Sequence, residues 1–452
     1  MDTKKLRQKI LDLAIHGKLV PQDPNDEPAS VLLERIRAEK ERLIKEGKIK
    51  KSKASKTSDT PHYENVPFEV PDNWVWMTLG EVGTWQSGGT PSRSNKTYYG
   101  GNIPWLKTGD LNDGLISDIP ESITEEAVAN SSAKINPAGS VLIAMYGATI
   151  GKLGILTFPA TTNQACCACI EFNAITQLYL FYFLLSQRNG FIAKGGGGAQ
   201  PNISKEIIVN TFIPLPPLSE QQRIVMEIEK WFALIDQVEQ GKADLQNTIK
   251  QTKSKILDLA IHGKLVPQDP NDEPAIKLLK RINPDFTPCD NGHYQNLPGS
   301  WCVAPMGMLC SLSDGEKQTG VERINLDVKY LRGERDAKTL TAGKFTPANS
   351  LLILVDGENS GEVFRTPIEG YQGSTFKRLS IKDDMNTDYV LQVINLHRKT
   401  LRENKVGSAI PHLNKKLFKE IEVPIPPYKE QQRIVEAINL AFKHLDTIME
   451  SL

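Results

Sequence analysis

The sequence has little of several things that mark particular classes of protein. Its six cysteines among 452 residues follow no disulfide framework, which favours a reducing compartment, the cytoplasm. No run of about 18 or more apolar residues occurs, so we expect no membrane span and no membrane partner. The first residues place apolar side chains at helical spacing and lack the apolar core of a signal peptide.

The sequence also lacks net charge, because 54 Lys and Arg residues balance 54 Asp and Glu residues. A protein that holds nucleic acid through a general excess of basic residues is therefore not expected. What the sequence does have is 39% hydrophobic residues. Its length leaves room for about two to four domains, each with its own core. These properties indicate a folded protein of several domains.

The clearest feature of the sequence is an internal repeat. The segment KILDLAIHGKLVPQDPNDEPA at 9–29 recurs letter for letter at 255–275. The block PDNWVWMTLG, which begins at Pro71, matches PGSWCVAPMG, which begins at Pro298. Chance does not produce so long an identity, so the chain contains a duplication.

A second pair of repeated blocks shows where the duplicated part begins and ends. IPLPPLSEQQRIV at 213–225 matches VPIPPYKEQQRIV at 423–435. The segment after Glu430 has the pattern of the front half of a helix, and the segment before His16 has that of its back half. The repeat is therefore cut inside its helix, as in a circular permutation. We expect the chain ends to lie close together in a pseudo-two-fold arrangement.

Between the two copies the two halves join in one helical segment, 219–262. Its apolar positions follow spacings of four and three residues, which predicts a coiled-coil seam over five heptads; an ordinary core helix is the alternative. At about 1.5 Å per residue the helix would be about 66 Å long. The seam consists of Ile224, Ile228, Trp231, Ile235, Val238, Lys242, Leu245, Ile249, Thr252, Ile256 and Leu259.

Two variable bodies lie between the repeated blocks. Apolar runs at 140–147 and 350–357 predict buried strands, and 176–187 and 388–399 predict helices. The predicted fold class is α/β (α+β), with two globular domains of small mixed β-sheets. Long antiparallel coiled-coil helices are expected to separate these domains in a pseudo-two-fold, circularly permuted arrangement.

The predicted division of the chain has five parts, and none of them carries a net charge of more than two in either direction. Neutrality therefore holds along the whole chain. The parts are an N-terminal helical segment with a basic linker (1–73), a first body (74–213), a central region with the long helix (214–297), a second body (298–423) and a C-terminal coiled-coil helix (424–452).

Three sequence patterns suggest catalysis, and each lacks a residue that the chemistry needs. Residues 147–153 resemble a phosphate-binding loop but have no Ser or Thr after the lysine. The segment 425–428 has isoleucine where adenine methyltransferases carry a hydrogen-bonding residue, and no G-x-G cofactor loop follows a strand elsewhere. Cys166, Cys167 and Cys169 lack zinc-site spacing. The chain is therefore predicted to be non-catalytic, with no metal or cofactor of its own.

Polar, basic and aromatic residues gather in turns of the first body, above all in QSGGTPSRSNKTYYGGNIPWLKTGDL at 86–111. Small residues let a backbone approach a phosphate, hydroxyl and amide groups can bond base edges, and Arg or Lys can bind guanine. For any single residue, ordinary turn chemistry explains the pattern equally well, so the hypothesis depends on the cluster. The candidate DNA contacts are Ser92, Arg93, Ser94, Asn95, Lys96, Tyr98, Tyr99, Lys107, Thr108, Lys152, Asn163, Gln164 and Gln200.

The second body has its corresponding turns at 315–338 and 371–378, without the GGTPS block or the Asn-Gln step of the first. Its candidate DNA contacts are Lys317, Arg323, Lys329, Arg332, Arg335, Asn359, Ser374, Thr375, Lys377 and Arg378. Two bodies that differ in their middles but share identical joints indicate one device that reads two different half-sites.

This arrangement resembles the specificity (S) subunit of type I restriction-modification enzymes over essentially the whole chain. The motifs that carry the resemblance are the duplicated KILDLAIHGKLVPQDPNDEPA, the two EQQRIV hinges and the block GGTPSRSNKTYYGGNIPWLKTGDL from Gly88. The resemblance implies two target-recognition domains, each reading one half of an asymmetric bipartite site in double-stranded DNA. The helical spacer would set the gap between the halves.

The resemblance also implies partner subunits. Two methylation (M) subunits would carry S-adenosylmethionine, and restriction/translocation (R) subunits would use ATP and Mg²⁺, so this chain would hold none of these cofactors. Its neutrality then fits a division of labour in which the partners supply much of the attraction to phosphates. Two other classes stay open: a coiled-coil adaptor or scaffold that does not read DNA, and an enzyme with methyltransferase or nuclease activity of its own.

Overall fold

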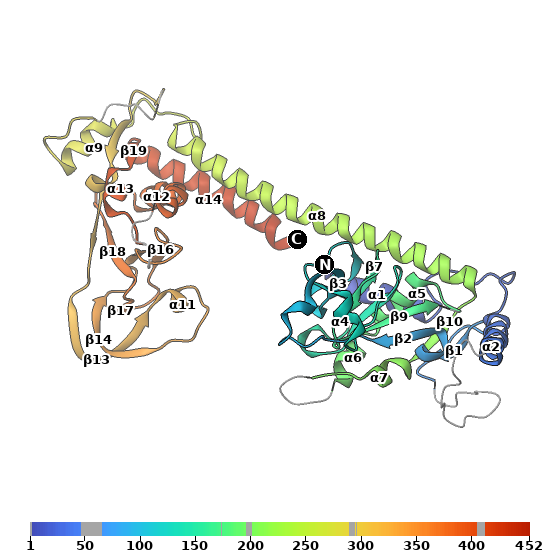
Figure 1. Cartoon of the computed structure of the whole chain (residues 1–452). Helices are drawn as coiled ribbons and strands as arrows, with labels where there is room; N and C mark the ends of the chain where they lie inside the picture. The colour runs from blue at the N-terminus through green and yellow to red at the C-terminus, as the bar shows by residue number, and fades with distance from the viewer. Residues whose placement is uncertain are drawn as a thin grey trace. The chain divides into compact units, whose positions relative to one another are not determined.

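The computed structural model describes residues 2–46, 66–172, 174–195, 201–288, 294, 296–404 and 412–452. The chain divides into two compact units, residues 1–240 (unit 1) and 241–452 (unit 2), each with its own hydrophobic core. The mixed α/β class with small sheets and a long helix is confirmed (Figure 1). Within the described ranges we find no helix with the length and hydropathy of a membrane span.

Unit 1 contains a five-stranded sheet in the order β2-β9-β6-β7-β4, a three-stranded sheet in the order β5-β3-β8 and a two-stranded pair, β1-β10. Its elements are α1 (Thr3–Ile15), α2 (Ala29–Lys45), β1 (Val75–Thr78), α3 (Leu79–Val82), β2 (Gly83–Ser87), η1 (Lys96–Tyr98), β3 (Tyr99–Leu106), η2 (Thr108–Asp110), β4 (Gly114–Ile116), β5 (Ser122–Ile123), α4 (Glu125–Ala129), β6 (Val141–Ala144), η3 (Gly147–Thr149), β7 (Leu153–Leu156), β8 (Thr161–Thr162), β9 (Cys166–Phe172), α5 (Gln177–Ser186), α6 (Arg188–Lys194), α7 (Lys205–Val209), β10 (Phe212–Leu215) and α8 (Leu218–Ile261), which continues into unit 2.

Unit 2 repeats this plan with a four-stranded sheet in the order β12-β18-β15-β16, a small barrel of β13, β14 and β17, and the pair β11-β19. Its elements are α9 (Ala275–Ile282), β11 (Cys302–Pro305), α10 (Met306–Leu309), β12 (Cys310–Ser313), β13 (Lys317–Leu326), α11 (Val328–Leu331), β14 (Thr339–Thr346), β15 (Leu351–Leu354), β16 (Val363–Arg365), β17 (Gly370–Gln372), β18 (Phe376–Ile381), α12 (Thr387–Glu403), α13 (Lys415–Glu420), β19 (Glu422–Ile425) and α14 (Tyr428–Ser451).

The predicted strands and helices of the two bodies are present. β6 and β15 lie centrally in their sheets and are buried at every position, which is why their sequences are unbroken apolar runs. The three clustered cysteines lie in β9 beside β6. Burial raises the pKa of the Cys167 and Cys169 thiols to about 12, so they remain protonated and serve as small apolar side chains.

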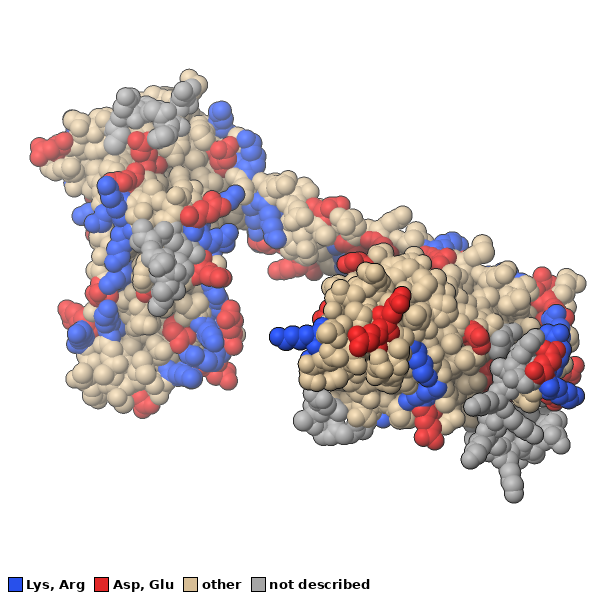
Figure 2. Space-filling view, viewed as in Figure 1, with Lys and Arg blue, Asp and Glu red and all other residues tan. Residues whose placement is uncertain are grey.

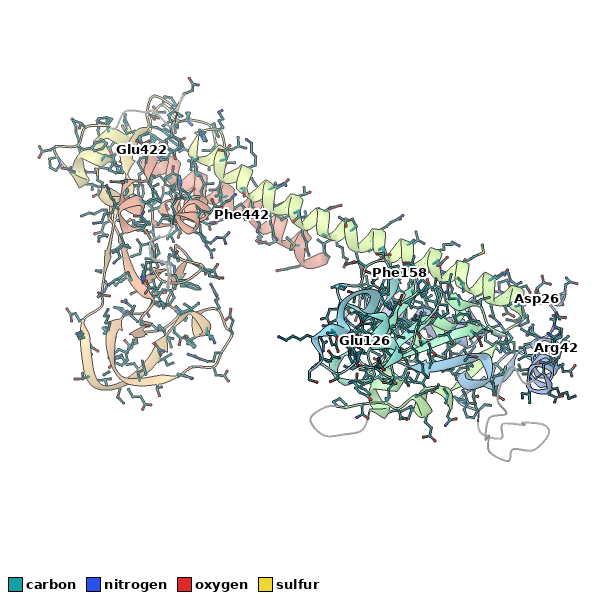
Figure 3. All side chains as sticks on the ribbon, in the orientation of Figure 1. Asp26, Arg42, Glu126, Phe158, Glu422 and Phe442 are labelled. Atoms are coloured by element: carbon teal, nitrogen blue, oxygen red, sulfur yellow. The ribbon has the colours of Figure 1, made fainter. Side chains whose placement is uncertain are left out.

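Each half of α8 packs against a second, antiparallel helix within its own unit. In unit 1, Arg7 of α1 pairs with Asp236 (2.6 Å) and Glu239 (3.3 Å) of α8. In unit 2, Lys253 of α8 pairs with Asp446 of α14 (2.5 Å), and its ammonium lies 5.0 Å from the ring centre of Phe442, labelled in Figure 3.

The predicted long helix is confirmed, but its seam is not buried throughout. Ile228, Ile235 and Ile249 are buried, whereas Val238 and Leu245 between them are 41% and 37% exposed. The reason is the length of the neighbouring helices, since each accompanies only part of α8 in its own unit. The heptad seam is therefore covered towards the two ends of α8 and partly exposed in its middle.

The repeated EQQR motif fastens each body to the helix. In unit 1 the fully buried Gln221 accepts a hydrogen bond from the backbone N–H of Thr176 (2.7 Å), which caps α5. Its side-chain NH₂ donates to the carbonyls of Ala174 and Pro216 (3.1 Å each). One side chain thus joins α8, the start of α5 and the proline-rich hinge after β10.

The flanking residues of the motif bind the other repeated blocks. Glu220 accepts hydrogen bonds from the indole N–H of Trp74 (2.9 Å) and the amide of Gln22 (2.5 Å), and its burial raises the pKa of its carboxyl. Arg223 pairs with Asp26 (2.6 Å), which is labelled in Figure 3. Because Gln22 and Asp26 belong to the duplicated PQDPNDEP segment, the motif connects all three repeated blocks of unit 1.

Unit 2 makes corresponding contacts with its own copies of these residues. We call the six motif residues and these contacts the EQQR lock. In unit 2, Trp301 donates to Glu430 (3.1 Å), the N–H of Asn386 donates to Gln431 (2.9 Å), Gln431 donates to the carbonyl of Pro426 (2.9 Å), and Arg433 pairs with Asp272 (2.7 Å).

The lock predicts that two adjacent glutamines contribute very differently to stability. Gln221→Ala leaves three backbone groups without partners, two of them in buried hydrogen bonds and one in a partly buried one, which is expected to lower the free energy of unfolding by about 2–4 kcal/mol. Gln222→Ala is the matched control because Gln222 is exposed, and its effect should stay within about 0.5 kcal/mol. Denaturant unfolding followed by tryptophan fluorescence measures both; equal effects would contradict the lock.

Candidate nucleic-acid interface

Two adjacent glycines bring the candidate residues of the first body together. A Cβ atom on Gly88 would lie only 2.2 Å from the carbonyl oxygen of Asn163, and the amide of Gly89 donates to β8 (2.8 Å). The loop after β2 therefore runs directly against the Asn163-Gln164 step, where the hydroxyl of Thr90 donates to the amide oxygen of Gln164. Residues that lie more than seventy positions apart in sequence thus form one surface.

An aromatic platform supports Arg93. Its guanidinium carbon lies 4.5 Å from the ring centre of Tyr99 and 4.9 Å from that of Trp105, which is the geometry of cation–π attraction. The same rings shape the loop, because the Tyr99 hydroxyl donates to the carbonyl of Pro91 (2.6 Å) and the Trp105 indole donates to that of Gly89 (3.0 Å). The Arg93 side chain remains 57% exposed, so it is held in place with its donors accessible.

Glu121 links the two predicted cations of this loop. Its carboxylate contacts the ammonium of Lys107 and lies 3.3 Å from the guanidinium of Arg93. The hydrogen bond from Lys107, together with that from Arg93, holds the pKa of the Glu121 carboxyl below its ordinary value. No sequence motif marks Glu121, because its role depends on the pairing of β5 with β3.

Several other candidates in this loop serve the local turn. The hydroxyls of Ser92 and Ser94 bond to each other (2.7 Å), and Asn95 caps the short helix η1 by accepting from the N–H of Thr97 (3.1 Å). Lys96 in η1 is exposed. The contacts of Ser92, Ser94 and Asn95 are therefore those of an ordinary turn, which was the alternative to DNA contact.

The remaining candidates of the first body have varied surroundings. Tyr98 is partly buried in the small core around Trp105, and Thr108 begins the turn η2. Lys152 donates to the carbonyl of Leu111 (3.4 Å) at the end of the candidate loop. Gln200 lies outside the described residues.

In unit 2 an acidic side chain again gathers basic ones. Asp314 pairs with Lys344 (2.7 Å) and with the candidate Lys377 (2.5 Å), and Gln372 donates to it (3.3 Å). The two lysine hydrogen bonds lower the pKa of Asp314 to about 2. Lys344 and Asp314 were missed from the sequence, because neither lies in a recognisable motif.

Three of the four candidate arginines of unit 2 belong to separate ion pairs and not to one cluster. Arg323 also stacks on Phe345, with 4.5 Å between its guanidinium carbon and the ring centre. Each of the three contacts a different carboxylate, although Glu362 is shared with Arg398. The pairs are Arg323 with Glu369, Arg332 with Glu362, and Arg335 with Asp327.

The other candidates of unit 2 divide by exposure. The exposed ones are Lys317 in β13, Lys329 in α11 and Ser374. The partly buried ones are Asn359, Thr375, and Arg378 in β18.

Neither unit shows a broad positive area on the face seen in Figure 2. Over the face of unit 2 in Figure 2, Lys and Arg lie beside Asp and Glu, and the corresponding view of unit 1 is largely uncharged. Such surfaces present a few positioned donors instead of a broad positive field. They are suited to contacts with individual groups, such as base edges, more than to general attraction to phosphates.

Comparisons with known proteins give consistent results. A family model described as "Type I restriction modification DNA specificity domain" matches residues 71–247 and 323–450. The specificity subunits of the Escherichia coli type I restriction enzymes EcoAI and EcoEI are 33% and 34% identical to this chain over 330 and 334 residues. Each alignment covers 62% of this chain and 55% or 54% of the relative, so the chain spans about half the length of these relatives.

Two further comparisons extend over more of the chain. The specificity subunit of the Methanocaldococcus jannaschii type I restriction enzyme MjaVIII is 21% identical over 397 residues, covering 85% of this chain and 88% of the relative. A chain from a solved structure titled for assembly and conformational transition of the type I R-M system has a TM-score of 0.61 at 18% identity. That alignment covers 85% of this chain and 94% of the other, and it shows a shared fold.

The loop at Gly88 and Gly89 runs so close to Asn163 that a side chain at Gly88 is expected to destabilise the protein. Gly88→Ala places a methyl group against the Asn163 carbonyl and should lower the free energy of unfolding by about 2–3 kcal/mol. Gly109→Ala in the same segment is the matched control, because its methyl group meets no atom within 4 Å. Thermal unfolding compares the two variants; similar melting temperatures would mean that the loop does not pack as described.

Proposed function

We propose a function from one premise: this chain belongs to the type I restriction modification DNA specificity family, whose model matches more than half of its residues. The chain is the specificity subunit of a type I restriction-modification complex. It recognises a DNA sequence and catalyses no reaction itself. Each body reads one half of a bipartite, asymmetric site in double-stranded DNA. The helix α8, together with α1 and α14 that pack on it, determines the spacing between the halves.

One observation carries this proposal. Both units have the same lock, built from identical residues, whereas the surfaces held by the locks differ. The first body presents Arg93 on an aromatic platform, and the second presents Lys344 and Lys377 around Asp314. A duplicated scaffold with two different polar surfaces is what recognition of two different half-sites requires.

The contacts proposed for the first half-site centre on Arg93. A guanidinium can bond O6 and N7 of guanine in the major groove, and its fixed position over Tyr99 and Trp105 reduces the entropy lost on binding. Glu121 neutralises Arg93 and Lys107 in the free protein, which limits non-specific attraction to phosphates. Thr90 and Gln164 add hydroxyl and amide groups beside them.

We place the catalytic chemistry in partner subunits. Two methylation subunits supply S-adenosylmethionine chemistry on adenine, and restriction/translocation subunits supply ATP- and Mg²⁺-dependent translocation and cleavage. The mixed surface charge supports this division, because a chain without a broad positive field depends on partners that enclose the duplex for much of its affinity. The complex acts in the cytoplasm.

An adaptor without DNA readout is the second candidate. It is supported by large apolar side chains that remain exposed on α8, including Trp231 and Leu234 at 41% and 44%. Exposed apolar side chains along a helix are typical of protein docking surfaces. Sequence-selective, salt-dependent DNA binding by the chain with its methylation partner distinguishes the two candidates, because an adaptor would confer no sequence preference.

The proposal predicts that the two bodies control the two half-sites independently. Arg93→Ala should weaken discrimination at one half-site by about 10- to 100-fold and leave the other unchanged, because each good bidentate base contact contributes about 1–3 kcal/mol. Binding of the chain with its methylation partner to sites mutated in either half measures this. Arg35→Ala is the matched control, since Arg35 is also exposed and paired with an acid, Glu27, but lies in α2. Loss at both half-sites, or no loss, would contradict the assignment.

The proposal also predicts that helix length controls the gap. Four residues inserted after Lys242 in α8 add about 6 Å of helix, more than one base-pair step of about 3.4 Å. The gap between the two half-sites should therefore lengthen, while the half-sites themselves stay the same. Mapping methylated adenines by modified-base sequencing measures the gap, and Lys242→Ala, which adds no length, is the control. An unchanged gap in the insertion variant would contradict the spacer role.

A further inference from the structure

The main sheets of the two units differ by one strand. The order β12-β18-β15-β16 in unit 2 corresponds strand by strand to β2-β9-β6-β7 in unit 1. Unit 1 then adds β4, which pairs in parallel with β7. Among the described residues, β16 has no such neighbour and is the edge of its sheet.

In unit 1 the extra strand is anchored by an acidic residue. The N–H of Asp113 donates to the carbonyl of Leu153 in β7 (2.9 Å), and the N–H of Leu153 donates to the Asp113 carboxylate (2.9 Å). The same carboxylate forms an ion pair with Arg188. These contacts hold Asp113 at the edge of β7, and the strand Gly114–Ile116, which follows it in the sequence, pairs along that edge.

No described residue pairs with the corresponding edge of β16. The carbonyl of Glu362 and the N–H of Thr366 bond to the β15 side of the sheet (2.8 and 2.9 Å). Because the direction of backbone groups alternates along a strand, the N–H and C=O groups of Val363 and Arg365 point away from β15. An edge of this kind is a template for another extended chain.

A cavity lies beside this edge, between β16 and α12. Its volume is about 350 Å³, and its apolar side includes Leu351, Val363 and Leu391. Its polar side includes Arg365 and Arg398, which pair with Asp388 (3.4 Å) and Glu362 (3.1 Å). Arg398 lies beside Gly361 as Arg188 lies beside Gly151, so an arginine is present at the position that binds the acidic anchor of β4 in unit 1.

We propose that the edge of β16 binds an extended segment of a partner protein as a fifth, parallel strand. The segment carries a carboxylate that bonds Arg398, as Asp113 bonds Arg188. Its apolar side chain two positions later, corresponding to Leu115, covers the cavity beside Arg365. The next side chain of the segment is small. Phe364 of unit 2 stands where unit 1 has Gly154, and the Phe364 ring already fills that side of the sheet against Phe376 (5.5 Å between ring centres).

The chemistry of the edge favours a polypeptide over nucleic acid. The charged residues that line the cavity are two arginines and two acids, and Arg332, which also contacts Glu362, adds a single positive charge beside them, so the edge has no broad positive field for phosphates. The outward N–H and C=O groups alternate at the spacing of a β-strand, which an extended peptide backbone satisfies along its whole length. The proposal does not depend on DNA recognition by either body.

A peptide with the sequence of β4 and its flanks tests the proposal with the full chain. The probe is a fluorescently labelled Asp-Leu-Asn-Asp-Gly-Leu-Ala-Ser-Asp-Ile, which is the sequence 110–119 with alanine in place of Ile116. Because β4 already occupies its place in unit 1, the free site is the β16 edge. We expect saturable binding by fluorescence anisotropy, weakened when asparagine replaces the fourth residue of the peptide.

Val363→Pro supplies the decisive comparison. It removes an outward N–H that takes no part in pairing with β15, and it should weaken peptide binding at least about tenfold, equivalent to the loss of one good hydrogen bond. Ile368→Pro, in the exposed turn after β16, is the control and should bind as the unchanged chain does. Absence of saturable binding to the unchanged chain, or equal affinity for Val363→Pro, overturns the proposal.

Hydrogen exchange on the unchanged chain keeps the test valid if Val363→Pro does not fold. Addition of the peptide should slow exchange of the amides of residues 363–365 while leaving 153–156 unaffected. Slower exchange only at other amides would mean that the peptide binds elsewhere, and it would overturn the proposal. Displacement of the peptide by duplex DNA, with the amides of residues 363–365 protected by the DNA, would assign the edge to nucleic acid and would also overturn it.

Discussion

The buried glutamine of each EQQR lock is the constraint on which the rest of the structure depends. Gln221 and Gln431 satisfy backbone groups at the start of a helix of the body and in the proline-rich hinge. A buried amide or carbonyl without a partner costs about 1–3 kcal/mol, so separation of the body from the helix is strongly unfavourable. Each body is therefore oriented by contacts that lie outside its variable surface.

This separation explains why the two bodies can differ. The first has a glycine loop, an aromatic platform and an additional strand, and the second has a longer hairpin and Phe364 where the first has Gly154. None of these differences reaches the lock. The surfaces proposed to read DNA can therefore change without altering the packing of the body on α8.

The fold was largely predictable from the sequence, because repeats and periodicity report backbone structure directly. The central strands and the long helix followed from apolar runs and heptad spacing. The exposure of Val238 and Leu245 did not, because heptad spacing does not show how far a neighbouring helix extends. In the candidate site the cations were visible as a cluster, whereas Glu121 and Asp314, which position them, become neighbours only through strand pairing.

The central claim is that one duplicated scaffold presents two interchangeable readers. The most direct measurement replaces residues 74–213 with a second copy of residues 301–423, which keeps the two tryptophans in register, and maps the DNA sites methylated by the resulting complex. The account predicts a bipartite site whose two halves contain the same bases, namely those that the second body reads in the unchanged chain. A folded chimera that still directs methylation to the original asymmetric site would contradict it.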